Sequence, residues 1–153
     1  MITAFIPTYN EEENIRCCIS GLQKYPEITE IIVVDDNSTD KTVEIAESLG
    51  VKVIVKDPSL PKMKSESMNV AAQHATNDIM FVTDADVYAI DLSDAIDIAQ
   101  GGADLVGIPC SIREDGRLIS KLENHEYDIA LKRIRPWIHR NTGYYNPSGA
   151  GFS

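Results

Sequence analysis

Two acidic residues spaced two apart, Asp84 and Asp86, are the side chains in this 153-residue chain that most clearly suggest chemistry. They follow residues 79–83, a short and mostly apolar run rich in β-favouring side chains. Such a run is typical of a strand buried on both faces of a parallel sheet, and ligands bind at the carboxyl edge of such sheets. Because carboxylates that point the same way repel each other, the pair predicts a bound cation. Mg²⁺ and Mn²⁺ favour oxygen ligands and usually share them with substrate phosphates.

Polar side chains also follow two other apolar runs. Residues 2–6 lead into the segment 7–11, and residues 31–34 lead into the segment 35–38. If all these runs are parallel strands, the three polar clusters lie at one edge of the sheet. Neither G-x-G-x-x-G nor G-x-x-x-x-G-K-[ST] follows any of the runs. The sequence therefore predicts a site that holds its ligand with carboxylates and binds phosphate through a metal.

Apolar residues at helical spacing fill the segments between these strands. One helix is predicted to start with the acids 11–13 in its first turn, and a second is predicted to start at a cap on Asn37 or Ser38. A third is predicted at residues 65–75, with Met68, Ala71 and Ala72 facing inward. The other predicted elements are a strand at 51–55, a helix at 94–99, a strand at 105–108, a hairpin turn at 113–117 and a long helix at 120–135. The alternation predicts one α/β domain of three layers, with a mainly parallel sheet flanked by helices.

Composition limits the ligand and the compartment. The chain has 24 acidic and 14 basic residues and a net charge of −10, which argues against nucleic acid as a partner. Its cysteines, Cys17, Cys18 and Cys110, match neither a zinc pattern nor a disulfide framework, so free thiols are expected. We find no leader peptide and no membrane-spanning run. A cytoplasmic protein is expected, attached to a membrane at most at its surface.

Four segments, in this order and at this spacing, resemble the family 2 inverting glycosyltransferases of the GT-A fold. They are residues 7–11 (PTYNE), residues 33–42 (VVDDNSTDKT), Lys64 with Asn69, and residues 84–86 (DAD). The resemblance covers residues 1–90 well and continues weakly to residues 148–152. It implies a nucleotide-diphospho-sugar transferase domain, with the donor half at 1–90 and part of the acceptor half at 91–153. The implied reaction is metal-dependent transfer of a sugar from a nucleotide-diphosphate sugar, UDP-sugar before GDP-sugar, with inversion.

The resemblance also implies roles for residues on the nucleoside side. The first turn, with Pro7, Thr8 and Tyr9, would hold the nucleoside together with Glu11. Asp36 would accept a hydrogen bond from the base ring, as a carboxylate can from an imide N–H.

On the phosphate side, the resemblance implies that Lys64 meets the base or the phosphates. Asp84 would face the ribose, and Asp86 with Asp84 would ligate Mg²⁺ or Mn²⁺ and assist the departure of the diphosphate. For Asp35, bracing a loop or capping a helix is the alternative to a functional role.

The acceptor side of the resemblance is incomplete. The family usually has an acidic catalytic base after the glycine strand, and this sequence has no Asp or Glu beyond Asp128. Either the chain is a fragment with its C-terminal part truncated, or it works without that base. A polyprenyl-phosphate acceptor is already anionic and needs no deprotonation, whereas a saccharide acceptor would need a base.

A basic segment, residues 132–140, contains Lys132, Arg133, Arg135 and Arg140 around Trp137. Cations beside an interfacial aromatic suit an anionic membrane surface. The segment is therefore a candidate for peripheral membrane contact, and the alternative is a helix whose apolar stripe packs on the sheet.

Three other readings compete. A haloacid dehalogenase-type phosphatase would use Asp84 as its nucleophile, but its acidic strand normally opens the chain. A response-regulator receiver has its acid pair after the first strand, whereas here the first strand leads into Pro7. A catalytically incomplete nucleotide-sugar binding module is the third reading.

Overall fold

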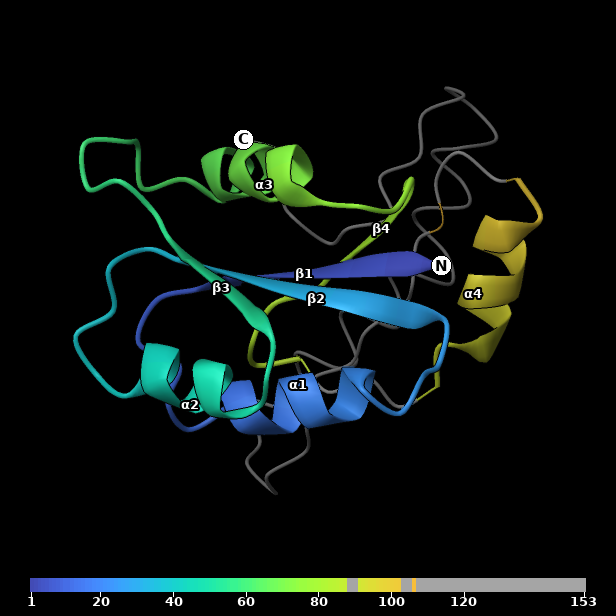
Figure 1. The fold of residues 1–153 in the computed structure, drawn as a ribbon, viewed down its shortest axis with the longest axis horizontal. Coiled ribbons are helices and arrows are strands. Elements are labelled where there is room, and N and C mark those ends of the chain that lie inside the picture. Colours follow the sequence, from blue (N-terminus) through green and yellow to red (C-terminus); the bar gives the residue numbers. More distant parts are fainter. Residues whose placement is uncertain (88–90, 103–105, 107–153) are drawn as a thin grey trace, which may run out of the picture. The chain divides into compact units, whose positions relative to one another are not determined.

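The computed structural model of the chain describes residues 1–87, 91–102 and 106. Its described part is built on a four-stranded parallel sheet with the strand order β3-β2-β1-β4 (Figure 1). The strands are β1 (Ile2–Thr8), β2 (Ile28–Asp35), β3 (Lys52–Val55) and β4 (Ile79–Val82). The four apolar runs that this part of the chain contains therefore form strands, as predicted.

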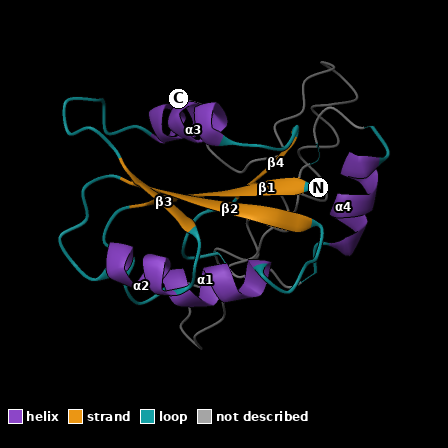
Figure 2. Ribbon diagram, in the orientation of Figure 1, coloured by secondary structure: helices purple, strands orange, loops and turns teal. Residues whose placement is uncertain are grey.

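The helices of the described residues are α1 (Ile15–Leu22), α2 (Thr42–Ser48), α3 (Lys64–His74) and α4 (Ser93–Gln100). Helices α1 and α2 cover one face of the sheet and α3 covers the other (Figure 2). Each of α1, α2 and α3 connects two parallel strands, as crossover connections must. The predicted three-layer α/β fold is confirmed.

The core lies on both faces of the two central strands. On the face that α3 covers, Phe5, Ile32 and Val34 are fully buried and pack with Ala71. Because side chains alternate along a strand, Ile6 lies on the opposite face, which α1 and α2 cover. Burial of each large aliphatic or aromatic side chain contributes about 1.5–3 kcal/mol, so the central strands anchor the sheet edge beyond them.

The carboxyl ends of the parallel strands lie at one edge of the sheet, where β1 extends beyond β4. Thr8 lies opposite Asp35, and Phe5 lies opposite Val82, the last residue of β4. The predicted strand end at Pro7 is wrong, because β1 continues through Pro7 to Thr8. Since β4 pairs only with residues 2–5 of β1, the missing N–H of Pro7 costs no bond to that strand.

Both helices that follow the central strands start later than predicted. Helix α1 begins at Ile15 with no acid in its first turn, and α2 begins at Thr42 instead of after Asn37 or Ser38. Asn37 instead has a left-handed backbone, with φ 61°. The predictions fail because the backbone N–H of Glu11 bonds to the side chain of Thr42 on α2, and the N–H of Ser38 bonds to the side chain of Asp35.

The predicted inward face of α3 is correct only at Ala71. Met68 is 39% exposed and Ala72 is exposed, whereas Ser67 is buried beside Ala71. The hydroxyl of Ser67 donates to the carbonyl of Met63 at 3.5 Å, so this polar side chain is buried with a partner.

Strand β4 is half-buried, which corrects the expectation of a strand buried on both faces. Among the described strands it pairs only with β1, so it lies at an edge of the sheet described here. An edge position leaves one side of the strand without a neighbouring strand to cover it.

The chain divides into two compact units, residues 1–96 and residues 97–153, and all four strands belong to the first. No helix in the described ranges is long and apolar enough to cross a membrane. Several predicted features lie outside the described residues: Cys110, the strand at 105–108 except residue 106, the turn at 113–117, the helix at 120–135, the basic segment 132–140 and residues 148–152. The division into a donor half and an acceptor half stays a prediction.

Candidate functional site

Two loops at the carboxyl edge of the sheet are fastened to each other by hydrogen bonds. Asn10 adopts a left-handed backbone with φ 55°, and its side-chain oxygen accepts from the N–H of Thr39 at 2.8 Å. In return, the N–H of Asn10 donates to the hydroxyl of Ser38 at 2.8 Å. The N–H of Glu11 donates to the buried hydroxyl of Thr42, also at 2.8 Å. The loops after β1 and β2 therefore form one unit.

Asp40 is the acidic member of the same network. It accepts from the N–H of Thr42 at 3.0 Å and from the N–H of Glu12 at 3.1 Å, and the hydroxyl of Thr42 donates to it as well. Burial opposes the charged form, but these bonds, that from the Thr42 hydroxyl foremost, outweigh it and hold the pKa of Asp40 below its ordinary value. The loop unit is thus organised around an ionised carboxylate.

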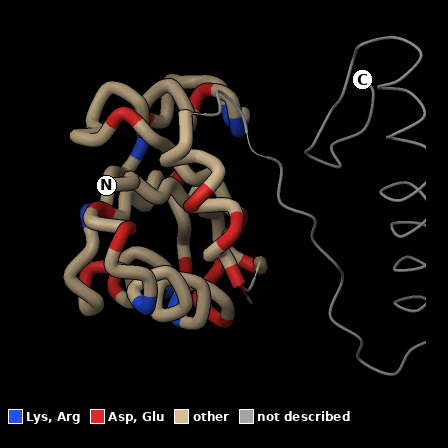
Figure 3. Tube along the Cα trace, turned by 90° about the vertical axis from the view of Figure 1, so that its right-hand side faces the viewer, with Lys and Arg blue, Asp and Glu red and all other residues tan. Residues whose placement is uncertain are grey.

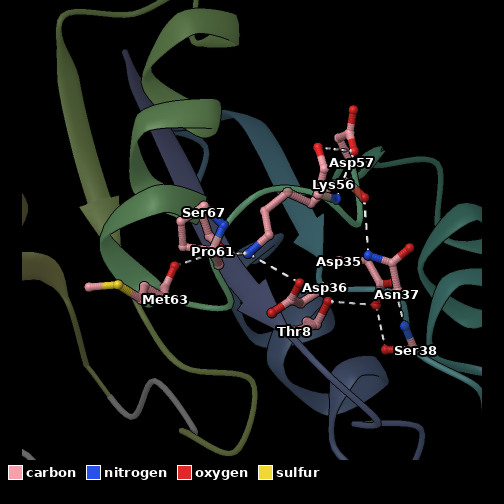
Figure 4. Close-up of polar contacts among 11 residues, drawn as sticks. Thr8, Asp35, Asp36, Asn37, Ser38, Lys56, Asp57, Pro61, Met63 and Ser67 are labelled. Atoms are coloured by element: carbon pink, nitrogen blue, oxygen red, sulfur yellow. Dashed lines mark hydrogen bonds and ion pairs between the residues drawn. The ribbon is translucent and has the colours of Figure 1, made fainter.

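Asp35 braces the loop that follows β2 (Figure 4). It is 1% exposed, and it accepts from the hydroxyl of Thr8 at 3.2 Å and from the N–H of Ser38 at 2.8 Å. The hydroxyl of Ser38 also donates to it. With both oxygens engaged and buried, Asp35 has the bracing role that was the alternative for this residue. Thr8 belongs to the turn that the family resemblance assigns to the nucleoside, and its hydroxyl is bonded within this buried contact.

Asp36, the next residue, turns toward β3. Its carboxylate forms an ion pair with Lys56 at 3.1 Å, and its side chain is 17% exposed (Figure 4). The sequence reasoning missed Lys56, whose side chain is completely buried. The available signal was a lysine directly after the strand β3, whose neighbour β2 also ends in polar residues.

Exposed side chains frame the same edge. Tyr9 is 52% exposed, and the ammonium of Lys62 lies 5.1 Å from the centroid of its ring. This is cation–π contact distance. Glu11 is half-buried and accepts from the side-chain amide of Asn14 at 2.8 Å. Pro7 is also half-buried and is paired with Val34 inside the sheet.

The carboxylates that follow β4 are both exposed. Ala85 between them is 2% exposed, so its buried side chain fixes the backbone while the two acidic side chains lie in solvent. Asp84 forms an ion pair with Lys64, the first residue of α3, at 2.5 Å, and both side chains are 51% exposed. The thiol of Cys18 on α1 donates to the carbonyl of Asp84 at 3.7 Å. Asp84 is therefore held from both sides of the sheet.

The environment of Cys18 shows that acidic residues from two loops lie near the same part of α1. Burial, and then the negative charges of Asp86 and Asp84, raise the pKa of the Cys18 thiol to about 12, and Glu11 contributes in the same direction. Residues from the loop after β1 and the loop after β4 thus act on one point of α1. This agrees with the prediction that the polar strand ends meet at one edge.

The donor set suits a hard cation that is shared with a phosphate. Within the described part of the chain, no three His, Cys, Asp or Glu side chains form a group that could hold a metal alone. Mg²⁺ and Mn²⁺ are often bound by one or two carboxylates plus water and substrate phosphates. Asp84 and Asp86, exposed and adjacent, fit that arrangement.

Local positive charge lies beside these acids, although Asp and Glu outnumber Lys and Arg along the described trace (Figure 3). Lys56, Lys62 and Lys64 all lie between β3 and the start of α3, on the segment that crosses the carboxyl edge of the sheet. An anionic ligand at this edge would meet cations in spite of the net charge of −10.

A model of the family described as Glycosyl transferase family 2 matches residues 3–153, so the chain belongs to that family. The dolichol-phosphate mannosyltransferase of Pyrococcus furiosus is 38% identical over 90 residues, which cover 56% of this chain and 26% of that protein. The matched segments correspond to between 18% and 28% of the length of the first curated relatives.

Solved structures agree with this assignment. The mannosyltransferase PcManGT from Pyrobaculum calidifontis, in complex with GDP-Man and Mn²⁺, matches 74% of this chain and 35% of its own, with 25% identity and a TM-score of 0.57. S. aureus TarS in complex with UDP matches 74% of this chain and 39% of its own, with 27% identity and a TM-score of 0.52. The fold is that of the GT-A glycosyltransferases.

Proposed function

We propose that this chain forms the donor site of an inverting glycosyltransferase that takes a sugar from a nucleotide-diphosphate sugar, with a UDP-sugar favoured. The observation that carries the proposal is that Asp36, and Asp84 with Asp86, follow parallel strands of one sheet in a family 2 chain, and that Lys64 pairs with Asp84. The TarS complex with UDP supports the choice of uracil, and the PcManGT complex with GDP-Man keeps guanine as the second candidate.

Each end of the nucleotide meets a different part of the edge. Asp36 accepts a hydrogen bond from the base, and the exposed ring of Tyr9 offers an apolar surface to the nucleoside beside Glu11. The loop that starts at Pro7 and Thr8 contacts the nucleoside through its backbone, because the Thr8 hydroxyl is already bonded to Asp35. The nucleoside is thereby oriented before the phosphates are engaged.

At the phosphates, Lys64 neutralises charge, and Asp84 and Asp86 hold a divalent cation. When bound, Mg²⁺ or Mn²⁺ supplies Lewis-acid stabilisation of the departing diphosphate. Two neighbouring structures bear on this proposal, since PcManGT and glucosyl-3-phosphoglycerate synthase from Mycobacterium tuberculosis were both solved with Mn²⁺. Asp84 also faces the ribose side, so it orients the leaving group as well.

The acceptor is a polyprenyl phosphate or a saccharide. The first is supported by the dolichol-phosphate mannosyltransferase among the relatives. Its phosphate oxygen is already anionic, so attack on the sugar from the face opposite the diphosphate needs no side chain to remove a proton. The basic segment 132–140 would hold such a lipid acceptor near the enzyme by peripheral membrane contact.

Two other functions are weaker. A phosphatase with Asp84 as nucleophile does not agree with the family match, and Asp84 follows an edge strand of the described sheet, whereas the central strand β1 ends in Thr8. A nucleotide-sugar binding module without catalysis would share the donor site and differ only in turnover.

Titration calorimetry with UDP, in the presence and absence of Mn²⁺, tests the proposal. We expect UDP binding that needs Mn²⁺ and that Asp86→Ala abolishes. Asp57→Ala is the matched control, because Asp57 is an exposed acid whose described side-chain bonds are local, to Ser59. UDP binding that is independent of the metal and of Asp86 would contradict the donor site. Release of UDP from a UDP-sugar, followed with acceptor present, then separates a transferase from a binding module.

A further inference from the structure

Lys56 is buried at the centre of a contact that joins three segments of the site edge. Its ammonium pairs with the carboxylate of Asp36 at 3.1 Å and donates to the carbonyl of Pro61 at 2.9 Å (Figure 4). Its backbone is fixed as well, because its N–H donates to the carbonyl of Asp35 at 2.8 Å and its carbonyl accepts from the side-chain amide of Asn37 at 3.1 Å. The position of the ammonium relative to Asp36 is therefore set by the sheet itself.

The pairing leaves the two oxygens of Asp36 in different situations. Oδ1 contacts an ammonium whose side chain is 0% exposed, so this oxygen is engaged from the interior. Among the described residues, no donor is bonded to Oδ2, and the Asp36 side chain as a whole is only 17% exposed. A ligand approaching from solvent meets a carboxylate that offers one open acceptor.

Nucleobases differ in the number of hydrogen-bond donors that they present to such a carboxylate. Guanine presents two adjacent donors on its pairing edge, N1–H and N2–H, and these match a carboxylate with both oxygens free. Uracil presents one imide N–H between two carbonyl oxygens, so it needs one acceptor and is repelled by a second bare oxygen. A carboxylate whose second oxygen is neutralised by a buried cation suits uracil better.

We propose that Lys56 is a positioning residue that makes the Asp36 site selective for uracil over guanine. The inference rests on the proposed donor site and concerns which base that site takes. Lys56 does not touch the base, since it is buried behind Asp36. It acts by fixing the orientation of the Asp36 carboxylate and by occupying one of its oxygens.

The test compares UDP and GDP binding to wild type and to Lys56→Met by titration calorimetry with Mn²⁺. For wild type we expect UDP to bind at least about tenfold more tightly than GDP, because a site with one acceptor leaves a guanine donor unpaired. In Lys56→Met, Asp36 is released and both of its oxygens become available. The ratio of the two dissociation constants should then fall to within about threefold of unity. A purely structural role for Lys56 would weaken both nucleotides and leave this ratio unchanged.

Lys52→Met is the matched control, because Lys52 is an exposed lysine at the start of β3, the strand that Lys56 follows, and its ammonium donates to the carbonyl of His74. It should leave the ratio at its wild-type value. Since removing a buried cation leaves Asp36 without its partner, Lys56→Met could unfold the chain. Lys56→Gln is then used in its place. Its neutral amide holds the Asp36 oxygen more weakly than the ammonium does, so the ratio should fall in the same direction, by less than in Lys56→Met.

Three results separate the outcomes. A wild-type preference for GDP, or an unchanged UDP-to-GDP ratio in both folded Lys56 variants, overturns the role of Lys56 and leaves the donor site intact. Failure of wild type to bind either nucleotide overturns the donor site, and the role of Lys56 with it. A ratio that falls in the Lys56 variants and holds in Lys52→Met supports the inference.

Discussion

The ammonium of Lys64 is paired with the carboxylate of Asp84, so the start of α3 and the end of β4 are joined by an ion pair at the predicted metal ligand. The contact is half-exposed on both sides, and exposed ion pairs contribute only about 0–1 kcal/mol. A ligand can therefore break it at little cost. A lysine in this position competes with a divalent cation for Asp84, and a diphosphate would draw it away.

Lys64→Met should therefore affect metal and nucleotide in opposite directions. Without nucleotide, we expect Mn²⁺ to bind about two- to fivefold more tightly, because the competing cation is gone. UDP should bind more weakly, because the phosphates lose a positive charge. Free Mn²⁺ measured by electron paramagnetic resonance gives the first quantity, and calorimetry gives the second. Lys62→Met is the control for the metal, and weaker Mn²⁺ binding in Lys64→Met would refute the competition.

Asp35 should matter for stability more than for ligand contact. Asp35→Ala leaves the hydroxyl of Thr8 and the N–H of Ser38 without an acceptor in a buried place, at a cost of about 2–3 kcal/mol. Urea denaturation measures this as a lower midpoint at an unchanged slope. Asp57→Ala, at an exposed acid, should leave the midpoint where it is. Equal midpoints for wild type and Asp35→Ala would exclude the bracing role.

The two adjacent cysteines should differ in reactivity. Burial and the nearby Asp86 and Asp84 raise the pKa of Cys18 to about 12, whereas Cys17 is exposed. Because the thiolate is the reactive form, iodoacetamide at pH 8 should modify Cys18 on the order of a thousandfold more slowly than Cys17. Tandem mass spectrometry of the peptide that carries both residues distinguishes them. In guanidinium the two rates should become similar, and comparable rates in the folded protein would contradict the buried environment.

The raised pKa of Cys18 predicts that the free energy of unfolding falls at high pH. The folded protein holds the Cys18 proton more firmly than the unfolded chain does. The resulting stabilisation is complete below the ordinary thiol pKa and is lost as pH rises toward about 12. Cys18→Ala should therefore show a smaller loss of stability than wild type between pH 9 and pH 11, measured by urea denaturation at each pH. An identical loss in both proteins would show that other groups cause it.

The loop unit around Asp40 should depend on pH at the acidic end. Hydrogen bonds from Thr42 and Glu12 lower the pKa of Asp40, so its stabilisation is present above the ordinary carboxyl pKa and fades as pH falls through the lowered value. Thr42→Val keeps the shape and removes the hydroxyl, so the pKa of Asp40 should rise. A side-chain carboxyl titration by NMR measures this. A titration midpoint for Asp40 that does not move in Thr42→Val would mean that the hydroxyl bond is unimportant.

Strands were easier to predict than helix starts, for a physical reason. The apolar runs at Ile2–Thr8 and Ile28–Asp35 each need to be buried on two faces, and a local pattern is enough to show that. The start of α2 depends on Asn10 and Glu11, whose partners in the sequence lie about thirty residues away. Asn37 and Ser38 are residue types that often cap helices. Here their side chains bond to Lys56 and Asp35 and do not cap α2.

The sequence by itself determined the class of fold and the position of the acids at one edge of the sheet, because burial patterns are local and because residues after parallel strands lie at one side of a sheet. It also placed Asp84 and Asp86 after the end of an apolar strand. Only the tertiary structure decided which partner each acid has. Asp35 is buried and accepts from Thr8, Asp36 is paired with Lys56, and Asp84 is paired with Lys64. Those assignments depend on contacts between residues far apart in the chain, and no local pattern encodes them.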